Sequence, residues 1–336
     1  MKNKNHKITT LLILTLGVVL AVSLIIGCGK SADLIKQAKF VAISDDGEIA
    51  YSEDGINWGK TKLSGNASWG SVCYGNGKFV AVGRSCNATV GDWDTWDGCN
   101  IAAYSNDGIK WELSELPKMA WYGVCYGNGK FVAVAYMSYT AVYSTNGINW
   151  TETTIPHSMT KICYSDGKFV ALHGGYESSG SDVAAYSNDG IKWFETAMPD
   201  NSAWTSICYG NGKFVAIASD NNKAAYSKDG IKWETTALPD NTWGRSVCYG
   251  DGKFVAITNG DGVPGRNGAY SKDGIKWIKT TMPDNSFWTS VCYGNGKFVA
   301  IAKENNKAAY SNDGISWKKI TMPGKEEWRS VCYAGE

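Results

Sequence analysis

The residue types best suited to chemistry gather in the stretch 84–100, where two cysteines flank a cluster of acids and tryptophans: Cys86, Asp92, Trp93, Asp94, Trp96, Asp97 and Cys99. Outside the cytoplasm, Cys86 and Cys99 are expected to form a disulfide that closes this loop. The two tryptophans suit stacking on a sugar or docking of a protein, or they fold back over their own sheet. The three aspartates suggest calcium, but their spacing is not that of a D-x-D-x-D-G loop, so no metal is predicted.

A second group of candidate ligand-binding residues is aromatic and spans two neighbouring copies of the repeat described below: Tyr136, Tyr139, His157, His173 and Tyr176. Met159 stands where the other copies carry tryptophan. This substitution either opens a pocket or is a neutral change in a drifting copy. Two histidines without a third ligand at suitable spacing do not predict zinc.

The chain contains four arginines, all at positions where the copies of the repeat differ: Arg84, Arg245, Arg266 and Arg329. The repeat does not require Arg329, because several other copies have Gly or Thr there. Since guanidinium groups bind carboxylates well, Arg84, Arg245 and Arg329 are candidate ligands for an anion. No nucleophile elbow, HExxH motif or phosphate loop appears, which favours binding without catalysis.

These candidates are carried by a repeat with a period of about 40 residues. Its first half is W-x-S-V-C-Y-G-N-G-K-F-V-A, with cysteines at 73, 125, 163, 208, 248, 292 and 332. Its second half is A-A-Y-S-x-D-G-I-x-W, with tryptophans at 58, 111, 150, 193, 233, 277 and 317. The repeat accounts for most of the tryptophan and cysteine in the chain. We expect its cysteines to be free, buried thiols.

Each repeat contains two tight-turn signals, such as Gly75-Asn76-Gly77 and Asn106-Asp107-Gly108, between short β-rich runs. Such turns connect hairpins, so each repeat predicts four strands. Four strands repeated seven times predict an all-β, seven-bladed β-propeller, with a β-solenoid as the alternative. The first copy lacks its first half and the last copy lacks its second half. We therefore expect 328–333 to pair with the N-terminal strands within 39–62 and to close the ring.

The turn Ser105–Trp111 resembles an Asp-box, the turn motif of sialidase-type (BNR) propellers. The position of its acid is occupied by Asp54, Asp107, Asn146, Asp189, Asp229, Asp273 and Asp313. The resemblance implies that these residues are structural and lie away from the active face. Sialidases bind a carboxylate with three arginines and carry a Phe/Tyr-Arg-Ile-Pro motif, which is absent here. A glycoside hydrolase or lyase acting on an anionic sugar is therefore the alternative function.

The N-terminus has the pattern of a targeting segment, with Lys2, Lys4 and Lys7 before an apolar run over 11–27. Ile25-Ile26-Gly27-Cys28 resembles a bacterial lipobox, in which the cysteine is lipidated and the chain is cut before it. The alternatives are an uncleaved anchor or an ordinary signal peptide. We expect a lipoprotein signal peptide (1–27), a lipid-anchored tether (28–38) and a propeller (39–336), held outside the cytoplasm at the cell membrane or outer membrane.

Charge and composition narrow the function classes. The 33 Lys and Arg nearly balance the 32 Asp and Glu, which argues against nucleic-acid binding by a basic surface. The hydrophobic fraction of 43% argues against disorder. Together these features predict a monomeric, non-catalytic binding or scaffold protein without a cofactor. It would recognise a glycan or a protein through its variable loops.

Overall fold

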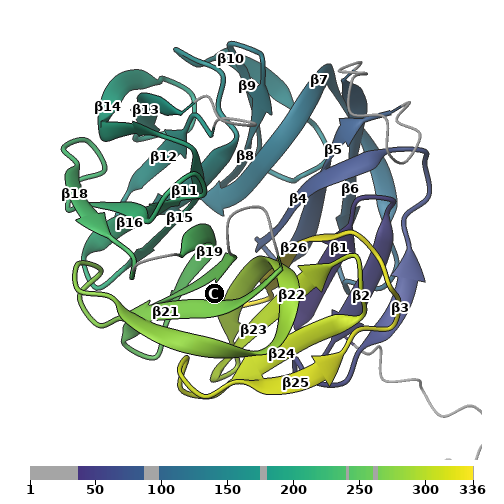
Figure 1. The fold of residues 1–336 in the computed structure, drawn as a ribbon. Coiled ribbons are helices and arrows are strands. Elements are labelled where there is room, and N and C mark those ends of the chain that lie inside the picture. Colours follow the sequence, from purple (N-terminus) through teal and green to yellow (C-terminus); the bar gives the residue numbers. More distant parts are fainter. Residues whose placement is uncertain (1–36, 87–97, 175–179, 240–241, 260–263, 336) are drawn as a thin grey trace, which may run out of the picture. The chain divides into compact units, whose positions relative to one another are not determined.

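A computed structural model describes residues 37–86, 98–174, 180–239, 242–259 and 264–335 (Figure 1). All elements named in it are β-strands, joined by hydrogen bonds into five antiparallel sheets of four or seven strands. The prediction of an all-β fold is confirmed. Among the described residues, no helix is long and apolar enough to span a bilayer.

Within each sheet, neighbouring strands follow one another in the sequence, except that the last strand of the chain joins the first. The first sheet contains β26 (Trp328–Tyr333), β1 (Phe40–Ser44), β2 (Glu48–Ser52) and β3 (Gly59–Lys62). The second contains β4 (Ser68–Gly75), β5 (Lys78–Ser85), β6 (Cys99–Ser105), β7 (Glu112–Gly127), β8 (Lys130–Tyr136), β9 (Thr140–Ser144) and β10 (Thr151–Thr154). The third contains β11 (Lys161–Ser165), β12 (Lys168–Leu172), β13 (Ser181–Ser187) and β14 (Phe194–Ser202). The fourth contains β15 (Trp204–Gly210), β16 (Lys213–Ala218), β17 (Lys223–Ser227) and β18 (Glu234–Ala237). The fifth contains β19 (Trp243–Gly250), β20 (Lys253–Asn259), β21 (Gly265–Ser271), β22 (Ile278–Gly294), β23 (Lys297–Lys303), β24 (Lys307–Ser311) and β25 (Lys318–Thr321).

Each seven-stranded sheet contains two four-stranded groups that share one long strand. The first half of β7 pairs with β6, up to Met119 opposite Cys99, and its second half pairs with β8, from Ala120 opposite Tyr136. Strand β22 is shared in the same way by β21 and β23. Pro117 lies in the register shift between Glu115 and Met119, just before β7 changes partner, so its missing N–H falls outside the paired positions of the ladder.

The two ends of the described chain meet in one sheet, as the offset of the repeat predicts. Phe40 lies opposite Tyr333 and Ile43 lies opposite Ser330 in the antiparallel pairing of β1 with β26. Contacts between innermost strands run from β26 to β4, on through β7, β11, β15 and β19 to β22, and from β22 back to β26 (Figure 1).

The hairpin turns such as Asn211-Gly212 and the Ser-x-Asp-Gly turns lie at the same end of the strands, here called the turn end. The Asn211 side chain at a hairpin turn donates to the Lys272 carbonyl at the Ser-x-Asp-Gly turn of the next group, 3.2 Å away. Asn211 and Gly212 have φ of 46° and 71°, the left-handed values that a type I′ hairpin needs. The remaining connections lie at the opposite end of the strands, here called the loop end.

The Ser-x-Asp-Gly turns, here called the box turns, are saturated by their own backbone. Asp229 Oδ1 accepts the N–H groups of Ile231 and Lys232 at 2.9 and 2.8 Å, and Ser227 Oγ accepts the N–H of Gly230. Burial alone would raise the pKa of such an aspartate, but the N–H donors prevail and lower the pKa of Asp54 to about 2. The other box aspartates shift in the same direction.

Valine, phenylalanine and alanine of the second and third strands form the core, together with one tryptophan at the start of most innermost strands. Five such tryptophans are fully buried: Trp69, Trp121, Trp204, Trp288 and Trp328. The sequence pattern also places Trp243 there, but an added residue shifts it. Gly244 occupies the register of Trp288, and Trp243 is only half-buried.

Candidate functional site

Three charged side chains from sequence-distant strands converge at the loop end. Arg84 Nη2, at the end of β5, lies 2.8 and 3.1 Å from the two carboxylate oxygens of Asp45, which follows β1. Arg329 Nη2, on β26, approaches the same carboxylate at 3.3 Å. Two of the predicted anion ligands therefore share one internal acid.

An aromatic path continues from this cluster to the second group of predicted ligands. The guanidinium of Arg84 lies 5.5 Å from the ring centre of Tyr122, and the Tyr122 and Tyr136 rings are 5.6 Å apart. Tyr122 was not among the sequence candidates, because it occupies a repeat position that varies freely. We call Asp45, Arg84, Arg329, Tyr122 and Tyr136 the loop-end arc.

Beyond Tyr136, Ser158 holds the backbone of Met137 and one of the two histidines. The N–H of Met137 donates to Ser158 Oγ at 2.8 Å, and His173 Nδ1 lies 2.6 Å from the Ser158 carbonyl. The His157 ring packs 6.1 Å from that of Tyr139, and its Nε2 lies 3.0 Å from a Glu195 oxygen. Predicted residues of two neighbouring sheets are thus brought together at the loop end.

Met159 lies in the core. Its side chain is fully buried in a cluster with Ile155, Val134 and Ala171, at the place that tryptophan occupies in most other groups. The tryptophan is also missing from its register at Gly244, so Met159 is not the single exception that the sequence pattern indicates.

Lys161 is the functional candidate that sequence reasoning missed. It lies at the start of β11, at the repeat position that Ser206, Ser246 and Ser290 occupy in other copies. Desolvation by burial, together with the charges of Arg329 and Arg84, lowers its pKa to about 8. The charges of Arg84 and Arg329 thus act on Lys161, although the strands that carry these residues are far apart in sequence.

Arg245 and Arg266 lie apart from this cluster. Burial lowers the pKa of Arg245, and its buried Nε has no hydrogen-bond partner in the described part of the chain. Arg266 is exposed, and it donates to the carbonyls of Met282 and Pro283 at 3.3 and 3.1 Å.

The predicted disulfide between Cys86 and Cys99 is present, with the two Cα atoms 4.7 Å apart. The rest of the loop that it closes, 87–97, lies outside the described residues. So do these further predicted residues: Trp93, Trp96, Asp92, Asp94, Asp97, Tyr176 and Cys28.

The seven repeat cysteines are free thiols on the innermost strands, as predicted, but by surface exposure only Cys292 is buried and the others are half-buried. Burial raises the pKa of Cys163 to about 12, and it raises the pKa of Cys125, on which the neighbouring Cys73 and Cys163 also act. The thiols therefore stay protonated near neutral pH. Across the described ranges, no three His, Cys, Asp or Glu side chains are grouped so as to hold a metal ion.

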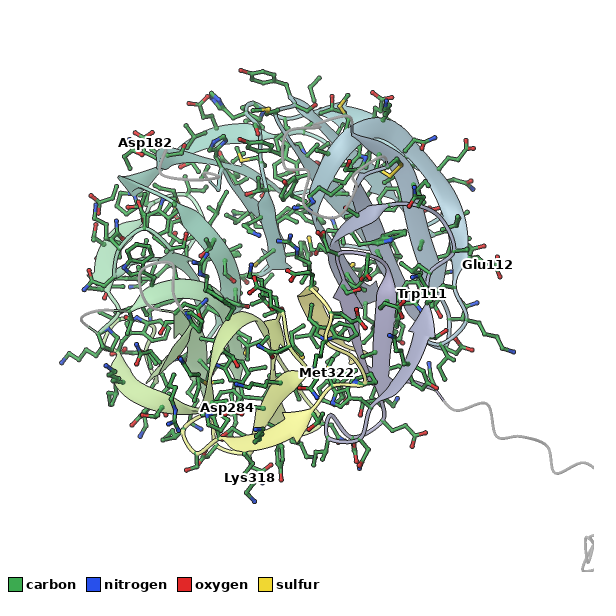
Figure 2. All side chains as sticks on the ribbon, turned by 45° about the vertical axis from the view of Figure 1, so that its right-hand side comes forward. Trp111, Glu112, Asp182, Asp284, Lys318 and Met322 are labelled. Atoms are coloured by element: carbon green, nitrogen blue, oxygen red, sulfur yellow. A yellow bond between two sulfur atoms is a disulfide. The ribbon has the colours of Figure 1, made fainter. Side chains whose placement is uncertain are left out.

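Charged side chains on the outer strands are exposed to solvent, unlike those of the loop-end arc. Glu112 on β7 and Lys318 on β25 are exposed at the outer side of their sheets (Figure 2). Asp284, also labelled there, pairs with Lys319 at 2.8 Å on the neighbouring four-stranded group. The Lys319 side chain is exposed and that of Asp284 is half-buried, and a pair this open to solvent adds little stability.

No protein-family model and no curated protein matches the chain. Solved β-propeller structures match its fold. Virginiamycin B lyase from Staphylococcus aureus has a TM-score of 0.65 and 13% identity, covering 81% of this chain and 91% of that one. YCF48 bound to a D1 peptide has a TM-score of 0.56 and 14% identity over 77% and 84% of the chains. Nidogen in complex with laminin has a TM-score of 0.52 and 10% identity over 71% and 97%. At these identities the likeness concerns the fold alone.

Proposed function

We propose that the chain is a seven-bladed propeller of the Asp-box type. Counting β7 and β22 once in each of the groups that they join, every innermost strand has its own group of four. The contacts that return from β22 to β26 and the pairing of β26 with β1 support a ring. The shared box geometry, with Asn146 in one copy, supports the Asp-box assignment.

We further propose that this propeller is a non-catalytic binding protein that recognises a protein partner through its loop end. The observation that carries this is the loop-end arc, which joins the arginine cluster to Tyr136 and so to Tyr139 and the histidines. Aromatic and arginine side chains are the residues that most often anchor protein interfaces. Among the fold neighbours, the structure of YCF48 holds a D1 peptide and that of nidogen holds laminin.

A photo-crosslinking residue placed at Tyr139, in cells that make the full chain, tests this function. We expect one partner protein to be crosslinked from Tyr139 and not from a matched site at Lys232, which lies on an Asp-box turn at the other end of the strands. Equal crosslinking from both sites would remove the loop end as the binding face. Capture of an oligosaccharide in place of a protein would favour recognition of a glycan.

The second candidate is a glycoside hydrolase or lyase acting on an anionic sugar. It is favoured by the convergence of Arg84 and Arg329 on one carboxylate, an arrangement that could equally hold a sugar acid. Incubation of the full chain with sialosides and uronate-containing oligosaccharides decides this point. Turnover that disappears in Arg84→Ala and Arg329→Ala would establish an enzyme.

For the location, we propose lipid anchoring at Cys28 outside the cytoplasm, as the lipobox-like sequence indicates. Cys28→Ala should move the protein out of the membrane fraction or block its processing. Unchanged lipid labelling of that variant would remove the anchor.

A further inference from the structure

Arg245 is the extra residue of a β-bulge at the loop end of β19. The ladder with β20 pairs Gly244 with Thr258 and Ser246 with Ile257, so Arg245 lies between two paired positions and has no partner in the ladder. Bulges re-aim a side chain away from the regular ladder and are common beside functional sites. The same bulge recurs on other innermost strands, where the extra residues are Gly70, Tyr122, Thr205, Thr289 and Arg329.

In two of these copies the bulge residue has a structural role. Thr205 Oγ1 donates to the carbonyl of Gly244 on the next innermost strand, 2.8 Å away. Thr289 Oγ1 donates in the same way to the carbonyl of Trp328, also at 2.8 Å. Both threonines therefore tie one group of four strands to the next at the loop end.

At Arg245 a different side chain makes this bond. The equivalent acceptor is the carbonyl of Trp288, and the Asn259 amide donates to it at 3.2 Å. The amide oxygen of Asn259 also accepts the N–H of Trp288 at 3.2 Å. Because the buried Asn259 satisfies both polar groups of the Trp288 backbone, the two groups of strands are tied together without Arg245.

The guanidinium of Arg245 is left without an acceptor in the part of the chain that the structure describes. Its Nε is buried and unpaired, and none of its nitrogens forms a hydrogen bond or an ion pair there. Arg266, in the same group of four strands, is satisfied instead, because its Nε and Nη2 donate to the carbonyls of Met282 and Pro283. A charged group that is partly buried without a counter-ion is unfavourable, and a bound anion would relieve this cost.

The anion that suits this position is a carboxylate. Burial lowers the pKa of Arg245 and no acid of the described ranges acts on it, so one unit of positive charge is unbalanced. A carboxylate carries one negative charge, and its two oxygens fit the parallel N–H donors of a guanidinium. A phosphate dianion would leave a negative charge unbalanced instead. Arg245 is partly exposed, so its terminal nitrogens are open to a ligand from the solvent.

We propose that Arg245 binds a single carboxylate group at the loop end through its terminal nitrogens. The carboxylate belongs either to a small organic acid or to an acidic residue or C-terminus of a partner protein. The site goes beyond the proposed binding function, because it uses no residue of the loop-end arc and does not depend on contact between Tyr139 and a partner.

NMR spectroscopy of the full chain in detergent tests the site directly, since four arginines give four Nε–Hε signals. Sodium propionate replaces sodium chloride at constant ionic strength, and Arg245→Lys and Arg266→Lys assign two of the signals by their loss. We expect the Arg245 signal to shift until it saturates, with a dissociation constant on the order of 10 mM for one charge-assisted contact. The Arg266 signal should stay in place, because its Nε already donates to a carbonyl.

A pair of matched variants gives a second measurement. Arg245→Thr restores the residue that Thr205 and Thr289 have at this position, so it should fold. Propionate should raise the urea midpoint of the wild type and of Arg266→Thr, and it should leave that of Arg245→Thr unchanged. Each of the two variants removes one positive charge, so overall charge cannot explain a difference between them.

An Arg245 signal that does not move would overturn the proposal, and so would a linear shift of all four signals or equal stabilisation of Arg245→Thr. An equal response to phosphate at the same ionic strength would overturn the preference for a carboxylate. Acetyl-Gly-Glu-Gly amide separates the two sources. Binding about tenfold tighter than propionate would indicate a carboxylate of a partner protein, and equal binding a small organic acid. Crosslinking from Tyr139 is unaffected by either result, so the two proposals fail independently.

Discussion

The two ends of the strands use charge in opposite ways. At the turn end, each box aspartate is satisfied by backbone N–H groups within three residues of itself, as at Asp229. At the loop end, Asp45 forms ion pairs with Arg84 and Arg329, which are far from it in the sequence. Lys161 forms no ion pair with an acid among the described residues. The comparison teaches that local saturation makes a polar group structural, whereas long-range and incomplete satisfaction leaves it available to a ligand.

The largest effect should come from disturbing the turn end. Gly230 has φ of 71°, and a Cβ added there would come within 2.6 Å of Val170 Cγ2, on the neighbouring sheet. Gly230→Val should therefore destabilise the protein by about 3 kcal/mol or more. Gly212→Val is the matched control, because φ is also 71° but no atom lies within 4 Å. Urea unfolding should show a much smaller loss for the control, and equal losses would contradict the packing argument.

Acid should weaken the turn end. The pKa of Asp54 is about 2 in the fold against 3.8 in the unfolded chain, so its contribution is complete above pH 4 and is lost as the pH falls towards 2. Asp54→Asn gives this turn the residue that Asn146 has in another copy. The variant should lose about 1 kcal/mol less stability than the wild type as the pH falls, after allowance for solvent screening. Unfolding curves from pH 5 to pH 2 give the comparison. An unchanged limb would mean that the box is not saturated in solution.

The loop end should respond to alkali instead. The unfolded chain holds the Lys161 proton up to a pKa of 10.5, whereas the fold releases it near 8, so Lys161 adds stability between these values. The repeat thiols, whose pKa burial raises, act in the opposite direction in every variant, so the wild type should lose about 1 kcal/mol less than Lys161→Ser after screening. Denaturation midpoints at pH 7.5 and pH 10 measure it. Stability that falls equally in both proteins would show that the ammonium already has a partner.

The smallest stability effect should come from the aromatic rim of the loop end. Tyr139 is 65% exposed, so Tyr139→Ala should change the free energy of unfolding by less than about 0.5 kcal/mol. The same variant should lose much more free energy of binding to the partner protein than of folding, as measured by the affinity of the purified variant. A large loss of stability would reclassify Tyr139 as structural.

The sequence predicts the fold well where the signals are local. Asn211-Gly212 and the Ser-x-Asp-Gly sequences indicate their turns, and the offset halves of the repeat predict that 328–333 pairs with the N-terminal strands. The shared strands β7 and β22 could not be predicted, because Pro117 and Pro283 look like turn residues until the change of partner is seen. In the sequence, Lys161 looks like a neutral change in one copy of the repeat, because only the fold allows the charges of Arg84 and Arg329 to act on it.

The pairing of β1 with β26 also sets an order of events during biosynthesis. Residues 40–44 emerge first but must wait for residues 328–333 before their strand has a partner on that side. Such a non-local pairing is slow to form and leaves an open strand edge in the meantime. A chain that stalls late in synthesis therefore exposes an unpaired, aggregation-prone strand edge. A chaperone that shields this edge would raise the yield of folded protein.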